Sequence, residues 1–278
     1  MSAATTAPAS ARATLQPVPD ARLRFTGILR SEWIKLTTLR STLWAYAILT
    51  VLQVAMGALL VMTQTDAMAA GAAADPAAAA HAAVQISTLG VLFNQLVISV
   101  LGVLLISGEY GTGQIRSSLT AVPTRLPVLW AKALVFAVTS FVVGLVAVFA
   151  AYAVTWPMLQ TKGITSSLGD VDVWPHLVGA AGYLALIGLV AFFLGALLRH
   201  TAGGIAAAVG LLLVVPSVIS FIGAEWARVL SDWLPGSVGQ TLFFGGGVFE
   251  PWQAVLVMLG WIAVVAVPAA ILMRRRDA

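Results

Sequence analysis

The sequence contains no cysteine, and only 9% of its 278 residues are charged. Without cysteine it can form neither a disulfide framework nor a zinc–thiolate site, and it has no thiolate nucleophile. Soluble globular domains carry roughly a quarter charged residues, whereas hydrophobic residues make up 60% of this chain. A soluble fold of this size cannot keep so much apolar surface away from water, so the composition predicts a membrane protein.

Motifs for several kinds of catalysis are also missing. None of the three lysines stands in the Gly-Lys-Ser or Gly-Lys-Thr sequence of a P-loop. The histidines His81, His176 and His200 lie on different segments, and neither a His-Glu-x-x-His pair nor a Gly-x-Ser-x-Gly elbow occurs. We therefore expect no enzymatic activity, no metal site and no cofactor in this chain.

Six apolar runs are long enough to cross a membrane as helices, which takes about 20 residues. Each must be helical, because lipid offers open backbone groups no hydrogen-bond partners. The expected fold is an all-α membrane protein with one domain over 21–278, preceded by a disordered tail over 1–20. The six runs are 43–63, 84–107, 133–156, 177–198, 203–223 and 252–273.

Lysine and arginine are enriched on the cytosolic side of membrane proteins, so their distribution indicates the orientation. With six spans and a cytosolic N-terminus, thirteen of the fifteen basic residues lie inside, and only Lys162 and Arg228 lie outside. One span more or fewer would destroy this asymmetry. The prediction is a multi-pass protein of the cell membrane with both termini cytosolic, whose basic residues require no nucleic-acid partner.

The interiors of the predicted spans contain no Asp, Glu, Lys or Arg. Carriers driven by ion or proton gradients usually place such groups near the bilayer midplane, so their absence disfavours that class. Polar side chains within spans mostly form hydrogen bonds between helices. Asn94 and Gln95, in the second run, are the residues that we consider for a substrate path.

Residues 25–40, before the first span, have apolar residues at helical spacing, which predicts a helix lying in the inner membrane interface. Glu32 lies within the apolar face and needs a partner there, from a neighbouring basic side chain or another subunit. Alternatively, it pairs with Lys35 or Arg30 at the surface. The face consists of Phe25, Ile28, Leu29, Trp33, Leu36 and Leu39.

The connection between the second and third runs is cytosolic in this orientation. Residues 112–121 are expected to form a short helix with Ile115 and Leu119 on one face, and Pro123 ends it because proline cannot continue the hydrogen-bond ladder. A bounded cytosolic helix can dock another protein, or it can be an ordinary connector. The composition does not distinguish these two possibilities.

The segment 224–251 separates the last two runs and is longer than most connections. Residues 224–234 are predicted to form a short amphipathic helix, which Pro235 breaks. Phe243 and Phe244 follow. So apolar an external segment is expected to dip partway into the membrane, the alternative being an aromatic-rich loop resting on the lipid headgroups.

Several motifs together point to a family. The sequence Gly108-Glu109-Tyr110-Gly111-Thr112-Gly113, followed by Pro123-Thr-Arg125 and Lys132, resembles the first cytosolic loop of ABC-2 type transporter permeases. The stretch Ser-Glu-Trp-Ile-Lys-Leu at 31–36 is similar to their N-terminal elbow helix. The order of elbow helix, six spans, cytosolic loop and external insertion extends the resemblance over most of the chain. Gln114 departs from it, since many relatives carry an apolar residue there.

The resemblance implies partners, because these permeases contain no ATPase and pair with a separate cytosolic nucleotide-binding subunit. Two copies of each make the transporter, so the partners are an ABC ATPase, a second permease copy or a paralogue, and the lipid bilayer. Residues 109–122 would form the coupling helix that receives the motion of the ATPase, with Glu109 anchoring the second span to it. The implied coupling residues are Glu109, Tyr110, Gly111, Thr112, Gly113, Ile115, Arg116 and Leu119, and those of the elbow helix are Glu32, Trp33 and Lys35.

The function expected from the resemblance is ATP-driven export, with the external insertion covering the exit. The alternative is a membrane scaffold or sensor that recruits a cytosolic partner without transport. The sequence does not identify the transported substrate, since drug, lipid, peptide and polysaccharide exporters can share this layout.

Overall fold

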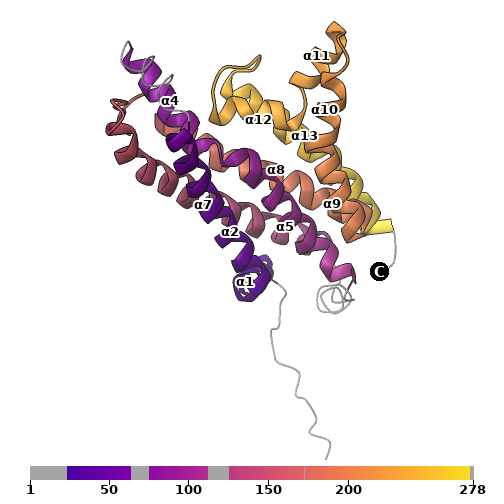
Figure 1. Ribbon diagram of the computed structural model, residues 1–278. Helices are drawn as coiled ribbons and strands as arrows, with labels where there is room; N and C mark the ends of the chain where they lie inside the picture. Colours follow the sequence, from indigo (N-terminus) through magenta and orange to yellow (C-terminus); the bar gives the residue numbers. More distant parts are fainter. Residues whose placement is uncertain (1–23, 64–74, 112–124, 172, 276–278) are drawn as a thin grey trace, which may run out of the picture.

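The structure is a computed structural model that describes residues 24–63, 75–111, 125–171 and 173–275. The tail expected over 1–20 and the helix expected over 112–121 lie outside these residues. Within them, every regular element is a helix, and the helices pack into one bundle (Figure 1).

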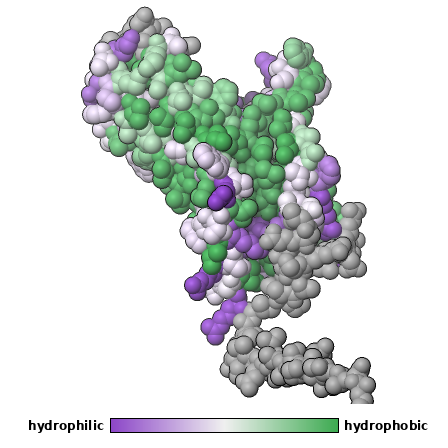
Figure 2. All heavy atoms as spheres, turned by 60° about the horizontal axis from the view of Figure 1, so that its bottom comes forward, coloured by the Kyte–Doolittle hydropathy of each residue, from purple (hydrophilic) through white to green (hydrophobic). Residues whose placement is uncertain are grey.

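Six helical stretches are long and apolar enough to cross a membrane, which confirms the prediction of a six-span, all-α membrane protein. Five of the six contain a predicted run completely, and the fifth ends at Ser220 rather than at 223. Hydrophobic residues dominate the upper part of the face shown in Figure 2, as expected for a surface that lipid contacts. The stretches are Arg40–Thr63, Ala77–Gly111, Leu126–Gln160, Val173–Leu198, Thr201–Ser220 and Pro251–Arg274.

The second stretch consists of two helices, α4 (Pro76–Thr88) and α5 (Val91–Gly111), which meet at Leu89 and Gly90. Glycine is required at this joint, because a Cβ at Gly90 would collide with Gln53 of α2 (Arg40–Thr63). The second and third stretches each contain 35 residues. At about 1.5 Å per residue, both are longer than the roughly 30 Å hydrocarbon core of a bilayer and must extend beyond it.

The centre of the bundle is α8 (Val173–Leu198), which packs against α4, α5 and α7 (Arg125–Gln160) and against later helices. The residues of α8 itself are apolar on every face of the helix, which is the pattern of a buried helix. Tyr183, Phe192 and Phe193 are among its fully buried side chains.

The fifth stretch is interrupted by one turn of π-helix, η1 (Gly210–Val214), between α9 (Thr201–Val209) and α10 (Val215–Ser220). Pro216 follows this turn and, because it has no N–H, cannot complete α-helical hydrogen bonding there. α9 packs against α5 and α8, whereas the main contacts of α10 are with its chain neighbours η1 and α11 (Glu225–Asp232).

The segment between the last two spans contains two helices rather than one. α11 matches the helix predicted over 224–234, and Pro235 ends it as expected. However, Pro235 also begins α12 (Pro235–Phe243), since its fixed φ angle suits the first position of a helix. Phe243, the last residue of α12, is fully buried against α8, before the last span α13 (Pro251–Arg275).

The helix expected over 25–40 is α1 (Phe25–Thr38), and the chain bends at Leu39 before α2 begins. Its buried residues are Ile28, Glu32 and Leu36, four residues apart, and it packs mainly against α7. The buried stripe thus includes Glu32, which lies within the predicted apolar face, whereas the prediction that this face lies in the membrane interface stays a prediction. Phe25, Trp33 and Leu39 are about half-exposed.

Candidate functional site

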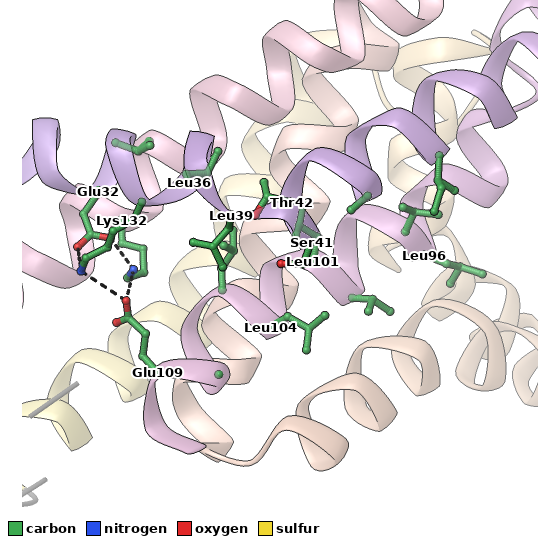
Figure 3. Close-up of a pocket in the computed structure, with 18 residues that line it drawn as sticks. Glu32, Leu36, Leu39, Ser41, Thr42, Leu96, Leu101, Leu104, Glu109 and Lys132 are labelled. Atoms are coloured by element: carbon green, nitrogen blue, oxygen red, sulfur yellow. Dashed lines mark hydrogen bonds and ion pairs between the residues drawn. The ribbon is translucent and has the colours of Figure 1, made fainter. Parts of the chain in front are cut away.

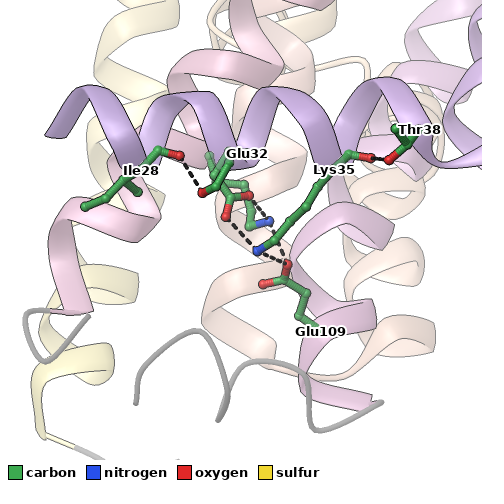
Figure 4. Close-up of polar contacts among 7 residues, drawn as sticks. Ile28, Glu32, Lys35, Thr38 and Glu109 are labelled. Carbon is green, nitrogen blue, oxygen red and sulfur yellow. Dashed lines mark hydrogen bonds and ion pairs between the residues drawn. The ribbon is translucent and has the colours of Figure 1, made fainter. Parts of the chain in front are cut away.

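Four charged side chains from three helices meet at the α1 end of the bundle, and we call them the ion-pair cluster: Glu32, Lys35, Glu109 and Lys132. The Lys132 ammonium donates to Glu32 Oε2 at 2.5 Å and to Glu109 Oε1 at 2.8 Å. Lys35 donates to Glu32 Oε1 at 2.8 Å and lies 3.6 Å from Glu109 Oε1. Figures 3 and 4 show the side chains converging from α1, α5 and α7.

The cluster is mostly buried and carries no net charge. Glu32 and Lys132 are only 4% and 6% exposed, and Glu109 is nearly as buried, whereas the Lys35 side chain is 30% exposed. Buried charges are tolerated when they are paired and hydrogen-bonded. Because two carboxylates face two ammonium groups, each charge in the cluster has an opposite partner.

The two α1 members of the cluster have altered acidities. Burial alone would raise the pKa of Glu32, but the charge and hydrogen bonds of Lys132, with those of Lys35, outweigh it and lower that pKa. Burial alone would lower the pKa of Lys35, but its hydrogen bond to Glu32 and the charge of Glu109 raise it instead. Both shifts favour the charged forms, so Glu32 and Lys35 are ionised at neutral pH.

Helical spacing explains how α1 contributes two residues. Glu32 lies between Ile28 and Leu36 on the buried stripe, and Lys35 lies three residues further along, within reach of the same carboxylate. Ile28 packs on the first turns of α7 at Val128 and Ala131, directly before Lys132. Apolar packing of α1 on α7 therefore positions the pair that bridges them.

The last turn of α5 also makes contacts toward α13 and the turn between α8 and α9. The guanidinium of Arg199 lies 5.1 Å from the centre of the Tyr110 ring, a cation–π distance, and donates to the carbonyl of Leu272 in α13 at 3.1 Å. Thr201, at the start of α9, donates to the Ser107 hydroxyl at 3.0 Å. We call Ser107, Glu109 and Tyr110 the α5 junction, because they join α5 to α1, α7, the α8–α9 turn and α13.

Arg199 lies in the turn between α8 and α9, where its backbone conformation is unusual. Arg199 has a φ of +53°, a conformation that side chains adopt rarely, and the adjacent His200 caps α9 by accepting from Gly203 N at 3.0 Å. The roles of Arg199 and Ser107 could not be predicted from the sequence. A lone arginine between two apolar runs was the only signal, and it does not indicate a partner.

A groove of about 590 Å³ begins at the ion-pair cluster and continues between α2 and α5 (Figure 3). Its walls are mostly aliphatic, and its volume lies within the range of about 300–1,000 Å³ that ligand pockets occupy. The lining residues are Glu32, Lys35, Leu36, Leu39, Ser41, Thr42, Ala45, Ile48, Leu96, Val97, Val100, Leu101, Leu104, Leu105, Gly108, Glu109, Lys132 and Val135.

The structure brings some of the predicted site residues together and separates others. Glu32, Lys35 and Glu109 meet in the ion-pair cluster, whereas Trp33 of the same helix is half-exposed and points elsewhere. Gly111 is the last residue of α5. The remaining predicted coupling residues, Thr112, Gly113, Ile115, Arg116 and Leu119, lie outside the described part of the chain.

Asn94 and Gln95, considered for a substrate path, are buried between helices. Asn94 Nδ2 donates to the Leu49 carbonyl at 3.0 Å and to Gln53 Oε1 at 2.8 Å, which holds α2 against α5. Gln95 accepts a hydrogen bond from the Tyr183 hydroxyl of α8. Neither residue lines the groove, and their contacts are those of interhelical hydrogen bonds.

The described residues contain no group of three or more His, Asp or Glu side chains arranged to bind a metal ion. A comparison with protein-family models and one with curated proteins each found no match to this chain. The geometry of the α5 junction is therefore the evidence from which a function is proposed.

Proposed function

We propose that this chain is the permease subunit of an ABC exporter, which forms the translocation path and is driven by a separate cytosolic ATPase. The α5 junction is the observation that supports this proposal. Glu109 joins the end of α5 to α1 and α7, and Tyr110 joins it through Arg199 to α13. A force applied to the chain after Gly111 would therefore reach several spans at once.

The position of the basic residues supports a cytosolic location for this end. Among the described residues, Arg24, Arg30, Lys35, Arg40, Lys132, Arg199 and Arg274 belong to the α1 end, whereas Lys162 and Arg228 belong to the turn after α7 and to α11. This asymmetry favours cytosolic termini and a cytosolic segment 112–124 in the cell membrane.

In the same proposal, α1 and α12 also have roles, as does a second copy of the chain. α1 lies in the inner membrane interface, with its exposed Trp33 and Phe25 in the headgroup layer. α12, packed on α8, dips into the opposite side of the membrane and covers the exit. Two copies of the chain, or one copy and a paralogue, form the path between them.

The ion-pair cluster provides the rigid link that coupling requires. The ATPase can bias the permease between two arrangements only if its motion changes their relative free energy. Glu109 acts as a positioning residue, because it fixes the end of α5 to Lys132 of α7 and Lys35 of α1. Without it, the end of α5 would lose its ion pairs to α1 and α7 and keep its contacts with the α8–α9 turn.

Co-purification with a P-loop ATPase encoded beside this gene tests the proposal. The complex is expected to hydrolyse ATP, and a compound screen for stimulated hydrolysis then supplies a transport substrate. Glu109→Ala is expected to insert normally and to reduce both stimulation and export by about 2- to 30-fold, the effect of losing 0.5–2 kcal/mol of coupling. The matched control is Glu225→Ala, since Glu225 is exposed on α11.

Two results would overturn the proposal. One is unchanged stimulation and export in Glu109→Ala, which would show that the α5 junction does not couple the ATPase to the spans. The other concerns orientation: because the chain contains no cysteine, Arg116→Cys carries a unique label site. Reaction of that cysteine with a membrane-impermeant maleimide added outside intact cells would place 112–124 where no ATPase can reach it.

A further inference from the structure

The groove between α2 and α5 opens on the side of the bundle. Leu39, Ile48 and Leu104 line it and are also about half-exposed, so its mouth faces the surroundings of the spans. Ile48 and Leu104 belong to helical stretches that are apolar and long enough to cross a membrane. In a bilayer, the medium at this mouth is the acyl-chain region of the leaflet on the α1 side.

The charged side chains that line the groove balance, Glu32 and Glu109 against Lys35 and Lys132, but the α1 segment beside them adds exposed arginines. Within residues 24–45, Arg24, Arg30, Lys35 and Arg40 are basic, and Glu32 is the only acid. Glu32 is buried against Lys35 and Lys132, so the exposed charge of this segment is positive. Arg40 is exposed and lies between Leu39 and Ser41, which both line the groove.

We propose that the groove binds one anionic phospholipid of the leaflet on the α1 side, with an acyl chain between α2 and α5 and the phosphodiester beside Arg40. Aliphatic walls match the acyl chain, and the basic segment matches the phosphate together with an anionic headgroup. The volume of about 590 Å³ is ample for a single acyl chain and lies within the range of ligand pockets.

Charge also argues against a second copy of this chain as the occupant. An isologous contact centred on the groove would bring the same surface of both copies together. The basic segments around Arg40 would then face each other, and like charges disfavour that arrangement.

The test uses the purified chain alone, without an ATPase, in micelles that contain phosphatidylglycerol or phosphatidylethanolamine. Native mass spectrometry is expected to show one phosphatidylglycerol retained more strongly than phosphatidylethanolamine. Leu104→Trp fills the groove from a residue that is 42% exposed, so this retention should disappear. Leu134→Trp is the matched control, because Leu134 of α7 is 49% exposed and does not line the groove.

A second pair of variants tests the headgroup contact. Arg40→Gln is expected to weaken phosphatidylglycerol retention about fivefold, the effect of one basic residue near an anionic lipid, with little change for phosphatidylethanolamine. Arg274→Gln, at an exposed residue in the last turn of α13, should change neither. Ile48→Trp repeats the groove-filling test if Leu104→Trp does not fold, since Ile48 is exposed at the same mouth.

Three outcomes would overturn the proposal. Equal retention of the two lipids, or unchanged retention in both tryptophan variants, would show that only bulk lipid is bound. Oxidation of Leu104→Cys to a disulfide-linked dimer, faster than of Leu134→Cys, would show that a second copy covers the groove. These measurements need neither ATP nor a partner subunit, so their failure is distinct from failure of the proposed exporter function.

Discussion

The two ends of the bundle are joined by different chemistry. At the α1 end, the ion-pair cluster links α1, α5 and α7 through four charged groups. At the opposite end, α12 lies directly on α8, and Gly179 and Gly239 allow the approach because a Cβ at either position would overlap Leu242 or Tyr183. We call this the α8–α12 contact, completed by the Tyr183 and Phe243 rings at 5.3 Å.

This difference indicates how each end can respond to force. Ion pairs are directional and bridge helices whose backbones are well apart, so they can transmit a displacement from one helix to the next. A contact between glycines and rings depends on shape, and any change in spacing removes dispersion contacts. We therefore expect the α1 end to fail through uncompensated charge and the α8–α12 contact to fail through steric overlap.

The largest expected effect is that of Lys132→Met. Lys132 is the only member of the cluster that bonds both carboxylates at 2.8 Å or less, and its loss leaves Glu32 and Glu109 buried with Lys35 alone. Removing one partner of a buried ion pair typically costs about 3–5 kcal/mol. The free energy of unfolding, measured by denaturant titration of tryptophan fluorescence in micelles, should fall by that amount.

Lys162→Met is the control for this variant. Lys162 is exposed in the turn after α7, so the same chemical change should alter the free energy of unfolding by less than about 0.5 kcal/mol. Equal losses in the two variants would mean that the cluster contributes nothing specific to the fold.

The next largest effect is expected at the other end, from Gly179→Ala. The new methyl group would overlap the carbonyl oxygen of Leu242, and because this atom belongs to the backbone, α12 as a whole must move away. Overpacking of this kind costs about 1–3 kcal/mol. The measurement is again the free energy of unfolding in micelles.

Gly182→Ala sharpens this test on the same helix. A Cβ at Gly182 meets no atom within 4 Å, so alanine there should be neutral or stabilise α8 by up to about 1 kcal/mol. If both alanine variants behaved alike, the close approach of α12 to α8 would not matter for stability.

The sequence was sufficient to predict the spans, because hydrophobic runs of about 20 residues have few other uses. It also identified Glu32 as an acid on an apolar face that required a partner. It did not decide between surface pairing and a neighbouring basic side chain, and both Lys35 and Lys132 bind it. Positions 32, 109 and 132 are far apart in the chain, and only tertiary packing shows that they meet.

Other features left no distinguishable signal in the sequence. The chain contains 25 glycines, and nothing local separates Gly179, which α12 contacts, from Gly182, which has open space. α12 was missed because Pro235 was interpreted only as the end of a helix. Periodicity places Trp33 on the apolar face of α1 but does not show which residues of that face pack against protein, and α7 covers the stripe through Glu32.

Acidification should weaken the α1 end but not the α8–α12 contact. We expect this loss of stability to be smaller than the effects of the substitutions above. The pKa of Glu32 is lowered: burial opposes this shift, but the charge and hydrogen bonds of Lys132 and Lys35 outweigh it. A lowered pKa means that the stabilisation by this carboxylate is complete above the ordinary value of about 4.3 and is lost as pH falls through the folded-state pKa. Because the pKa of Lys35 is raised, the stabilisation by its ammonium group is complete below about pH 10.4 and is lost only as pH rises through the folded-state pKa. Stability should thus be level from about pH 5 to 9 and decline below about pH 4.

Comparison of variants assigns that acid decline to the cluster. Glu32→Gln should be less stable than the wild type at pH 7 and should show a shallower loss below about pH 4, because the titrating group has been removed. Gly179→Ala should lose stability at every pH but keep the wild-type slope, since Gly179, Tyr183, Gly239, Leu242 and Phe243 include no carboxylate. The effect is smaller than that of Lys132→Met, because a protonated Glu32 still accepts hydrogen bonds and Lys132 remains paired with Glu109. An unchanged acid slope in Glu32→Gln would assign the decline to another carboxylate and remove Glu32 from the account of how the α1 end is stabilised.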